Sequence, residues 1–238
     1  MYTMRCPVSS SCGNRYQYDI GVDISTTTDT SLSLSLSLSL RCLAGKVEKK
    51  GPHHLDVAEC YVHLSDVYAK QDLWPEALEL LEDALAIQQD KLRPSDRVTG
   101  ETLGKMGSAS AHIAGRLDEA IDYHDRSISA VLETHGVDDS SLIPSYFSMG
   151  KIHRERGDHT NAMISLKRAL TCIVKIGHPG ERDVLVLMAQ TAAASGQQDQ
   201  ALVYLKKCHA FLCKTAGKDA QDTLDMLATV SSIERSLA

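Results

Sequence analysis

The sequence predicts an all-α fold, an α-solenoid of four helical hairpins followed by one C-terminal helix. Three observations lead to this prediction. A turn motif of fixed spacing recurs four times after His53, and each copy lies between two apolar stripes with helical periodicity. Aromatic residues make up 5% of the chain. The core must therefore consist mainly of Leu, Ala, Ile and Val, which suit helix-on-helix packing.

The first 52 residues show no helical periodicity, and a strict Ser-Leu alternation runs from Ser31 to Leu40. As protein, this alternation has the period of an amphipathic strand. As a genetic message, it is what a CT dinucleotide repeat encodes, and we favour this second interpretation. A targeting peptide is a third interpretation, but Asp19, Asp23 and Asp29 count against it. We expect residues 1–52 to be a largely unstructured, low-complexity segment.

Each copy of the repeated motif has a turn residue five places before an alanine. The turn residue, usually Gly, ends one helix in a left-handed conformation, and the polar residues after it start the next helix. The small alanine lets the two helices approach closely. The four motifs run from Asp72 to Ala77, Gly115 to Ala120, Gly157 to Ala162 and Gly196 to Ala201.

Successive alanines of the motif are 43, 42 and 39 residues apart. This spacing predicts a repeat domain over residues 53–238, with repeats at about 55–92, 97–135, 140–176 and 179–215. In the first hairpin we expect helices over residues 56–70 and 74–88. Their facing stripes are Val57, Tyr61, Leu64 and Tyr68 in the first helix, and Ala77, Leu81, Ala84 and Leu85 in the second.

The same pattern recurs in the other hairpins, and it is loosest in the second. There His124 and Ser127 occupy positions where the pattern has a bulky apolar residue and a small one. A core histidine hydrogen-bonded to a neighbour is the preferred interpretation of His124, and a functional group is the alternative. In the third hairpin Met149 and Gly150 precede Ala162, Leu166 and Ala169, and in the fourth Met188 and Ala189 precede Ala201, Leu205 and Cys208.

One more amphipathic helix is expected over residues 220–237. Leu224, Leu227, Val230 and Ile233 lie on one side of it, which suits a helix that covers the open end of the array or begins a fifth repeat.

This arrangement of large and small residues resembles the tetratricopeptide repeat. The period of about 42 residues is similar to that of kinesin light chains and nephrocystin-like proteins, whose linkers resemble G-x-x-H-P-D-x-A/L. The resemblance covers residues 51–238, with linkers such as Gly51-Pro-His-His54-Leu-Asp-Val-Ala58. It implies a protein-binding scaffold that holds an extended peptide on the concave side of the solenoid.

Two features of kinesin light chains have no counterpart here. Residues 1–52 contain no heptad pattern, so kinesin heavy chain is not supported as a partner. The Asn residues that hold cargo backbone are replaced by residues such as Val62, Lys105, Phe147 and Val186. A co-chaperone clamp would need Lys and Asn on the inner faces, but Asp66 stands where the first repeat would carry Asn.

The first helices of the hairpins should line the concave groove. Helical spacing then places Lys105 and His112 of the second repeat in the groove, together with Phe147, Lys151 and Arg154 of the third. One interpretation is that these residues bind an acidic or phosphorylated extended peptide, with Phe147 supplying an apolar contact. The other is that they are solvated charges on helix faces.

Neither a metal site nor a catalytic centre is predicted. The histidines at 53, 54 and 63, and His209 between Cys208 and Cys213, lack the spacing of metal ligands. No nucleophile elbow, phosphate loop or H-E-x-x-H motif occurs, and no cofactor is implied. The seven cysteines contain no C-x-x-C pair, and we expect Cys60, Cys172 and Cys208 to pack as small apolar residues.

Charge and hydropathy narrow the functional class further. The net charge of −6 argues against nucleic-acid binding, and no stretch approaches 18 consecutive apolar residues, so no membrane span is expected. We expect a cytoplasmic, non-catalytic scaffold that binds a partner protein or peptide in its groove. The alternatives are a structural module that assembles through its convex face or free end, and a co-chaperone-like adaptor.

Overall fold

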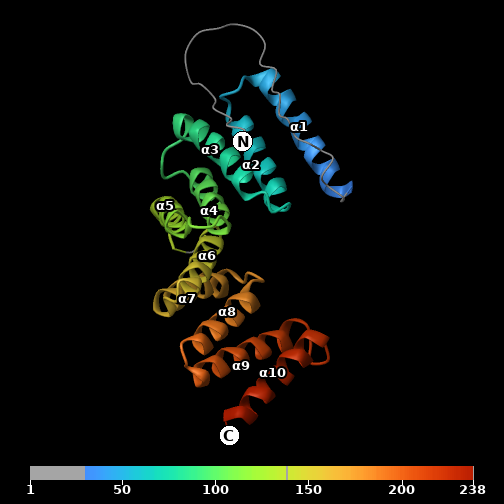
Figure 1. The fold of residues 1–238 in the computed structure, drawn as a ribbon, viewed down its shortest axis with the longest axis vertical. Coiled ribbons are helices and arrows are strands. Elements are labelled where there is room, and N and C mark those ends of the chain that lie inside the picture. Colours follow the sequence, from blue (N-terminus) through green and yellow to red (C-terminus); the bar gives the residue numbers. More distant parts are fainter. Residues whose placement is uncertain (1–29, 138, 238) are drawn as a thin grey trace.

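The computed structural model describes residues 30–137 and 139–237, which form ten α-helices and no strands. The helices stack one after another from α1 at one end to α10 at the other (Figure 1). The prediction of an all-α solenoid is confirmed. The helices are α1 (Thr30–Lys50), α2 (Leu55–Ala69), α3 (Trp74–Lys91), α4 (Arg97–His112), α5 (Leu117–His135), α6 (Leu142–Glu155), α7 (His159–Ile176), α8 (Glu181–Ala194), α9 (Gln198–Thr215) and α10 (Gln221–Leu237).

Four antiparallel pairs, α2/α3, α4/α5, α6/α7 and α8/α9, make the hairpins. The backbone of each turn explains why the repeated motif needs Gly or Asp. Asp72, Gly115, Gly157 and Gly196 have φ angles of 58°, 81°, 76° and 79°, in the left-handed region that the sequence predicted. Such a residue ends the first helix and reverses the chain into the second.

The first helices of the hairpins lie along one side of the stack. α4 contacts α6 and α6 contacts α8, although a second helix separates each pair in the chain. Together with α2, which continues the row at one end, these helices form the surface that we call the inner face of the array. Charged side chains on the row can therefore approach the same ligand.

Two close helix contacts occur where a glycine of a first helix meets a large side chain of a second helix. A Cβ atom on Gly150 would lie 2.6 Å from Cδ2 of Leu166, and one on Gly107 would lie 2.8 Å from the His124 ring. Leu166 and His124 are both fully buried. Glycine at these two positions thus lets α6 approach α7 and α4 approach α5.

Helix α1 differs from the expectation for residues 1–52. Residues 30–50 form a helix that packs on α2, whereas residues 1–29 lie outside the described part of the chain. The reason is that the Ser-Leu alternation also contains leucines at helical spacing. Leu36 and Leu43 are buried against α2, with Leu40 and Val47 partly buried beside them at spacings of three and four residues.

Docking of α1 depends on this stripe, which provides a test. We expect Leu43→Ala to weaken the docking of α1 by about 2 kcal/mol, because it removes a buried side chain from the α1–α2 contact. Amide hydrogen exchange should accelerate in residues 34–50 and stay unchanged in α6 to α9. Leu38→Ala is the matched control, since Leu38 is 55% exposed. Equal effects of the two substitutions would contradict the docked position of α1.

The inward face of α10 is rotated relative to the predicted one. Thr223 and Val230 are buried and Met226 and Ile233 contact the α8–α9 core, whereas Leu224 and Leu227 are each 45% exposed. Thr223 faces inward because its hydroxyl donates a 2.8 Å hydrogen bond to the carbonyl oxygen of Gly217.

Candidate functional site

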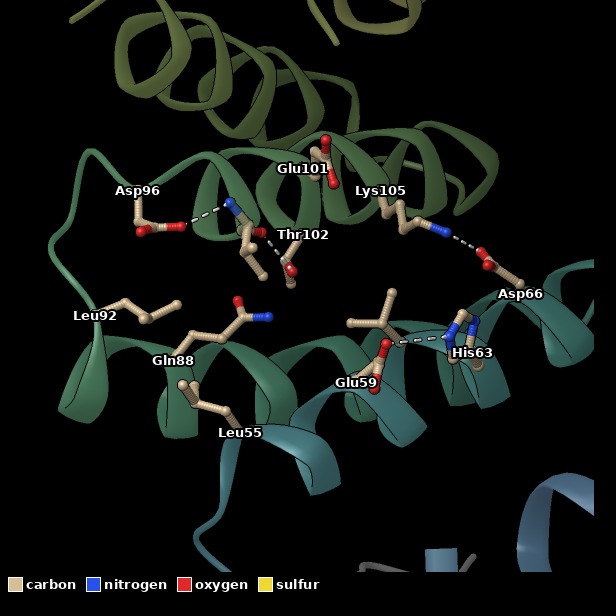
Figure 2. Close-up of a pocket in the computed structure, with 12 residues that line it drawn as sticks. Leu55, Glu59, His63, Asp66, Gln88, Leu92, Asp96, Glu101, Thr102 and Lys105 are labelled. Carbon is tan, nitrogen blue, oxygen red and sulfur yellow. Dashed lines mark hydrogen bonds and ion pairs between the residues drawn. The ribbon is translucent and has the colours of Figure 1, made fainter. Parts of the chain in front are cut away.

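A pocket of about 460 Å³ opens on the inner face between the first two hairpins. α2 and the end of α3 form one side and α4 forms the other (Figure 2). α2 and α4 approach each other less closely than α4 and α6 do, which leaves room for the pocket. Its lining residues are Leu55, Glu59, Val62, His63, Asp66, Gln88, Leu92, Asp96, Val98, Glu101, Thr102 and Lys105.

The rim of the pocket is acidic. Four carboxylates, from Glu59, Asp66, Asp96 and Glu101, line it, against the cation of Lys105 and the imidazole of His63. Glu59 on α2 and Glu101 on α4 place one acid on each wall.

Each rim carboxylate already has a partner. Glu59 pairs with Lys46 of α1 at 3.1 Å and Glu101 with Arg97 at 2.8 Å, while Lys105 donates a hydrogen bond to Asp66. Asp96 accepts a 2.9 Å hydrogen bond from the Val98 amide and caps α4. Side chains of Glu59 and Glu101 are 62% and 46% exposed. Such solvent-exposed pairs stabilise a protein by only about 0–1 kcal/mol, so a ligand cation can replace the present partners.

Gln88 lies at the buried end of the pocket. Its side chain is 1% exposed, and its Oε1 has no hydrogen-bond partner among the described residues. Figure 2 shows the carboxamide pointing from α3 toward the space between α2 and α4. A buried acceptor without a partner costs roughly 1–3 kcal/mol, which a ligand with an N–H donor would recover.

Gln88 is also an exception among the hairpins. It follows the motif alanine Ala77 by eleven residues, and the residues at that distance in the other hairpins are Val131, Ile173 and Leu212. All three are buried apolar side chains. Of these four equivalent positions, position 88 is the one that lines this pocket, and it carries a polar residue where the others carry apolar core residues.

The five residues predicted from the sequence fall into three groups. Lys105 lines the pocket, bound to Asp66. His112, at the end of α4, stacks on Trp74 of α3 with ring centroids 3.9 Å apart and planes inclined by 8°. The remaining three lie together on α6.

On α6, the Lys151 ammonium lies 4.8 Å from the centroid of the Phe147 ring, a cation–π contact. Arg154 donates a 3.1 Å hydrogen bond to Oε1 of Gln190 on α8. Lys151 and Asp66 each directly follow the small residue of their helix, Gly150 and Ser65. The same inner-face position is thus acidic in the first hairpin and basic in the third.

The sequence matches the tetratricopeptide repeat family over residues 33–90 and 98–173, more than half of the chain. The chain belongs to this family. The first matched range begins inside α1, so α1 lies within the tetratricopeptide repeat match. The resemblance to this family that the sequence suggested is confirmed.

Solved tetratricopeptide structures share the fold. A putative kinesin light chain repeat protein from Podosopora anserina is 20% identical, with a TM-score of 0.65 over 78% of this chain and 88% of that chain. BtubC (BKLC) from P. vanneervenii is 14% identical, with a TM-score of 0.65 over 88% and 93%. MamA is 20% identical, with a TM-score of 0.58 over 76% and 91%. No curated protein matches the sequence.

These tetratricopeptide repeats support a role in protein–protein interaction, and the family is generally non-enzymatic. Within the part of the chain that the structure describes, no group of three or more His, Cys, Asp or Glu side chains could hold a metal ion. In the same part, no helix is both long enough and apolar enough to cross a membrane.

Sequence reasoning missed Gln88, Glu59 and Glu101 as site residues. For Gln88 a signal was available, because the other three hairpins have Val, Ile and Leu at the equivalent position. The repeat pattern does not mark the two glutamates.

Proposed function

We propose that this protein is a non-catalytic scaffold that binds an extended peptide segment of a partner protein along its inner face. The observation that carries the proposal is the pocket of about 460 Å³ between the first helices of two successive hairpins. On a solenoid, consecutive first helices form a continuous surface that suits an extended ligand.

The second part of the proposal concerns the charge of the peptide. Phe147, Lys151 and Arg154 form a basic, partly apolar surface on α6, which would contact acidic residues of the peptide. Lys105 contributes less than these residues because Asp66 already neutralises it. His112 is stacked on Trp74, so we expect it to contribute least to peptide binding among the five residues.

Peptides selected from a random display library on the full chain provide the test. Lys151→Glu combined with Arg154→Glu should weaken binding of a selected peptide about tenfold or more, because charge-assisted hydrogen bonds become repulsions. The matched control is Lys167→Glu with Lys214→Glu, which makes the same charge change at exposed positions of α7 and α9. Fluorescence anisotropy gives the Kd values. Equal weakening by both pairs would refute binding on the inner face.

One observation favours a second function, assembly through the free end of the array. Leu224 and Leu227 of α10 are each 45% exposed, although they are large apolar residues. If the free end mediates assembly, Leu224→Ser with Leu227→Ser should abolish partner capture in a pull-down, whereas the Lys151 and Arg154 substitutions should leave it unchanged. The opposite result would leave the groove as the binding surface.

A further inference from the structure

We propose that the pocket between α2 and α4 binds an arginine side chain of the partner peptide. This inference rests on the proposed function, because it identifies one residue of the peptide that the groove would hold. The partner segment would then have a mixed character, with an arginine at the first two hairpins and acidic residues at α6.

Charge complementarity is the first reason. The pocket presents carboxylates from both walls, with Glu59 on α2 and Glu101 on α4. Their present partners, Lys46 and Arg97, are themselves surface cations that are 28% and 44% exposed. A guanidinium offers five N–H donors in a fixed plane, and it can bind two carboxylates from opposite sides.

The unpartnered amide of Gln88 is the second and independent reason. Its Oε1 is buried, lacks a hydrogen-bond partner among the described residues and faces the pocket. The three equivalent residues of the other hairpins are apolar, so packing between helices does not require a polar group there. A donor that enters the pocket would satisfy this acceptor.

The shape and lining favour a long side chain with a polar end. Leu55, Val62, Leu92 and Val98 supply apolar surface to the pocket lining. This surface suits the aliphatic stem of arginine, while its guanidinium reaches the acceptors. Lysine has a similar stem but a compact charge with no planar fork, so it should bind more weakly.

A direct test uses N-acetyl-arginine methylamide as the probe in an NMR titration of the full chain. We expect shifts of the Gln88 side-chain amide and of backbone amides around Glu59 and Glu101. N-acetyl-citrulline methylamide, which has the same length without the charge, should produce much smaller shifts. Equal shifts with both probes, or shifts confined to other surfaces, would overturn the arginine pocket.

Substitutions then separate a binding role from a structural one. Glu59→Gln with Glu101→Gln should weaken probe binding about tenfold. Gln88→Leu, which introduces the residue type of the equivalent position at Leu212, should weaken it as well without lowering the melting temperature. If Gln88→Leu lowers the melting temperature and leaves probe affinity unchanged, Gln88 is a packing residue and the inference fails.

The display selection distinguishes this inference from the proposed function. Selected peptides that need Lys151 and Arg154 but show no preference for arginine at any position would support the groove and refute the arginine pocket. Enrichment of arginine that disappears on the Glu59→Gln, Glu101→Gln chain would support both. If the protein binds the arginine probe but no peptide is selected, the arginine pocket is supported and the peptide scaffold is refuted.

A second inference comes from an independent observation at the α1–α2 contact. The Sγ atoms of Cys42 and Cys60 lie 3.7 Å apart. Cys42 is exposed and Cys60 is buried beneath it. From this geometry we infer that the two thiols form a disulfide under oxidising conditions, which links α1 covalently to the first hairpin.

The chemistry requires only a disulfide oxidant such as oxidised glutathione. The exposed Cys42 thiolate attacks one glutathione sulfur, which forms a mixed disulfide and releases the first glutathione thiolate. The Cys60 thiolate then attacks the Cys42 sulfur and releases the second. Two protein thiols are oxidised and one glutathione disulfide is reduced. The sulfurs need to approach from 3.7 Å to about 2.05 Å.

The local charges act in both directions. Burial raises the pKa of the Cys60 thiol, and the nearby Lys46 ammonium opposes this effect. Lys46 thus favours the Cys60 thiolate, which makes the second attack.

Peptide mapping of the full chain after treatment with oxidised glutathione tests this inference. We expect a linked pair of peptides that contain Cys42 and Cys60, with slower hydrogen exchange in residues 34–50. Cys42→Ser and Cys60→Ser should each abolish the link, and Cys213→Ser should not. A stable mixed disulfide at Cys42 without a link to Cys60 would overturn it.

Discussion

Replacing Leu166 by alanine should lower the free energy of unfolding by about 2–5 kcal/mol, because the substitution leaves a cavity in a packed core. Leu166 is 0% exposed and belongs to the largest cluster of buried residues, which α5, α6, α7 and α8 share. Urea denaturation followed by circular dichroism measures the change. Ile164→Ala on the same helix is the control, since Ile164 is 46% exposed and should change stability by less than about 0.5 kcal/mol.

Gly150 of α6 provides a second test of the same packing, because it lies directly against Leu166. A Cβ atom at position 150 would lie 2.6 Å and 2.7 Å from Cδ2 and Cγ of Leu166. Gly150→Ala alone should therefore destabilise the protein by about 1–3 kcal/mol through overpacking. In the Leu166→Ala chain the same substitution should be neutral or stabilising, since the cavity accepts the added methyl group and alanine favours the helix.

A reference for the helix-propensity effect exists in α1. Gly45 lies within that helix, and no side chain beyond its chain neighbours and no other helix comes within 4 Å of the place where its Cβ would be. Gly45→Ala should stabilise α1 by up to about 1 kcal/mol. If Gly150→Ala behaves like Gly45→Ala in the otherwise unchanged chain, α6 and α7 do not pack as closely as described.

The hairpins could be predicted from the sequence because their signals are local and repeated. Asp72 and the three motif glycines adopt the left-handed backbone that the turn spacing indicated. Cys60, Cys172 and Cys208 are buried, as their place in apolar helical segments predicted. Each of these features depends on residues within a few helical turns of one another, so the local sequence is enough to predict them.

Features that depend on contacts between distant elements were harder to predict. In α1 every second residue from Ser31 to Leu40 is leucine, so the sequence does not indicate which leucines face the core. The contact with α2 determines that Leu36 and Leu43 are the buried ones. Likewise, Leu224 and Leu227 have the helical spacing of a buried stripe, but the packing of α10 against α9 rotates them outward.

The candidate site shows the same division. The sequence grouped Phe147, Lys151 and Arg154 on one helix, and all three lie on α6. It gave no indication that Asp66 neutralises Lys105 or that Trp74 holds His112, because both contacts join different helices. The pocket around Gln88 likewise depends on the separation of α2 and α4, which no single helix pattern specifies.

His124 shows how a departure from the repeat pattern affects the energetics. The residues four places after the motif alanine in the other hairpins are Leu81, Leu166 and Leu205. His124 is buried and packs against Gly107, but neither ring nitrogen has a hydrogen-bond partner among the described residues. The expectation of a core histidine bonded to a neighbour was therefore right about burial and wrong about the bond. The ring lies directly against Gly107 of α4, which has no side chain to accept a hydrogen bond.

Stability should fall as pH falls, because of this histidine. Burial lowers the pKa of His124 from an ordinary value of 6.5 to about 4. Between these values the unfolded chain binds a proton that the folded chain does not, so acidification favours unfolding. Above pH 6.5 His124 does not affect the free energy of unfolding. As the pH falls from 6.5 to 4, protonation of His124 in the unfolded chain lowers this free energy, by about 3 kcal/mol near pH 4.

Replacing His124 by leucine tests this linkage and has the largest expected benefit for stability at low pH. The substitution introduces the residue of the other three hairpins and removes two buried nitrogens without partners. Urea denaturation from about pH 7.5 to 4.5 should show a flatter pH dependence than in the unchanged chain. His53→Gln, at an exposed position, is the control and should retain the decline. A decline of equal slope in the His124→Leu chain would assign the pH dependence to other groups.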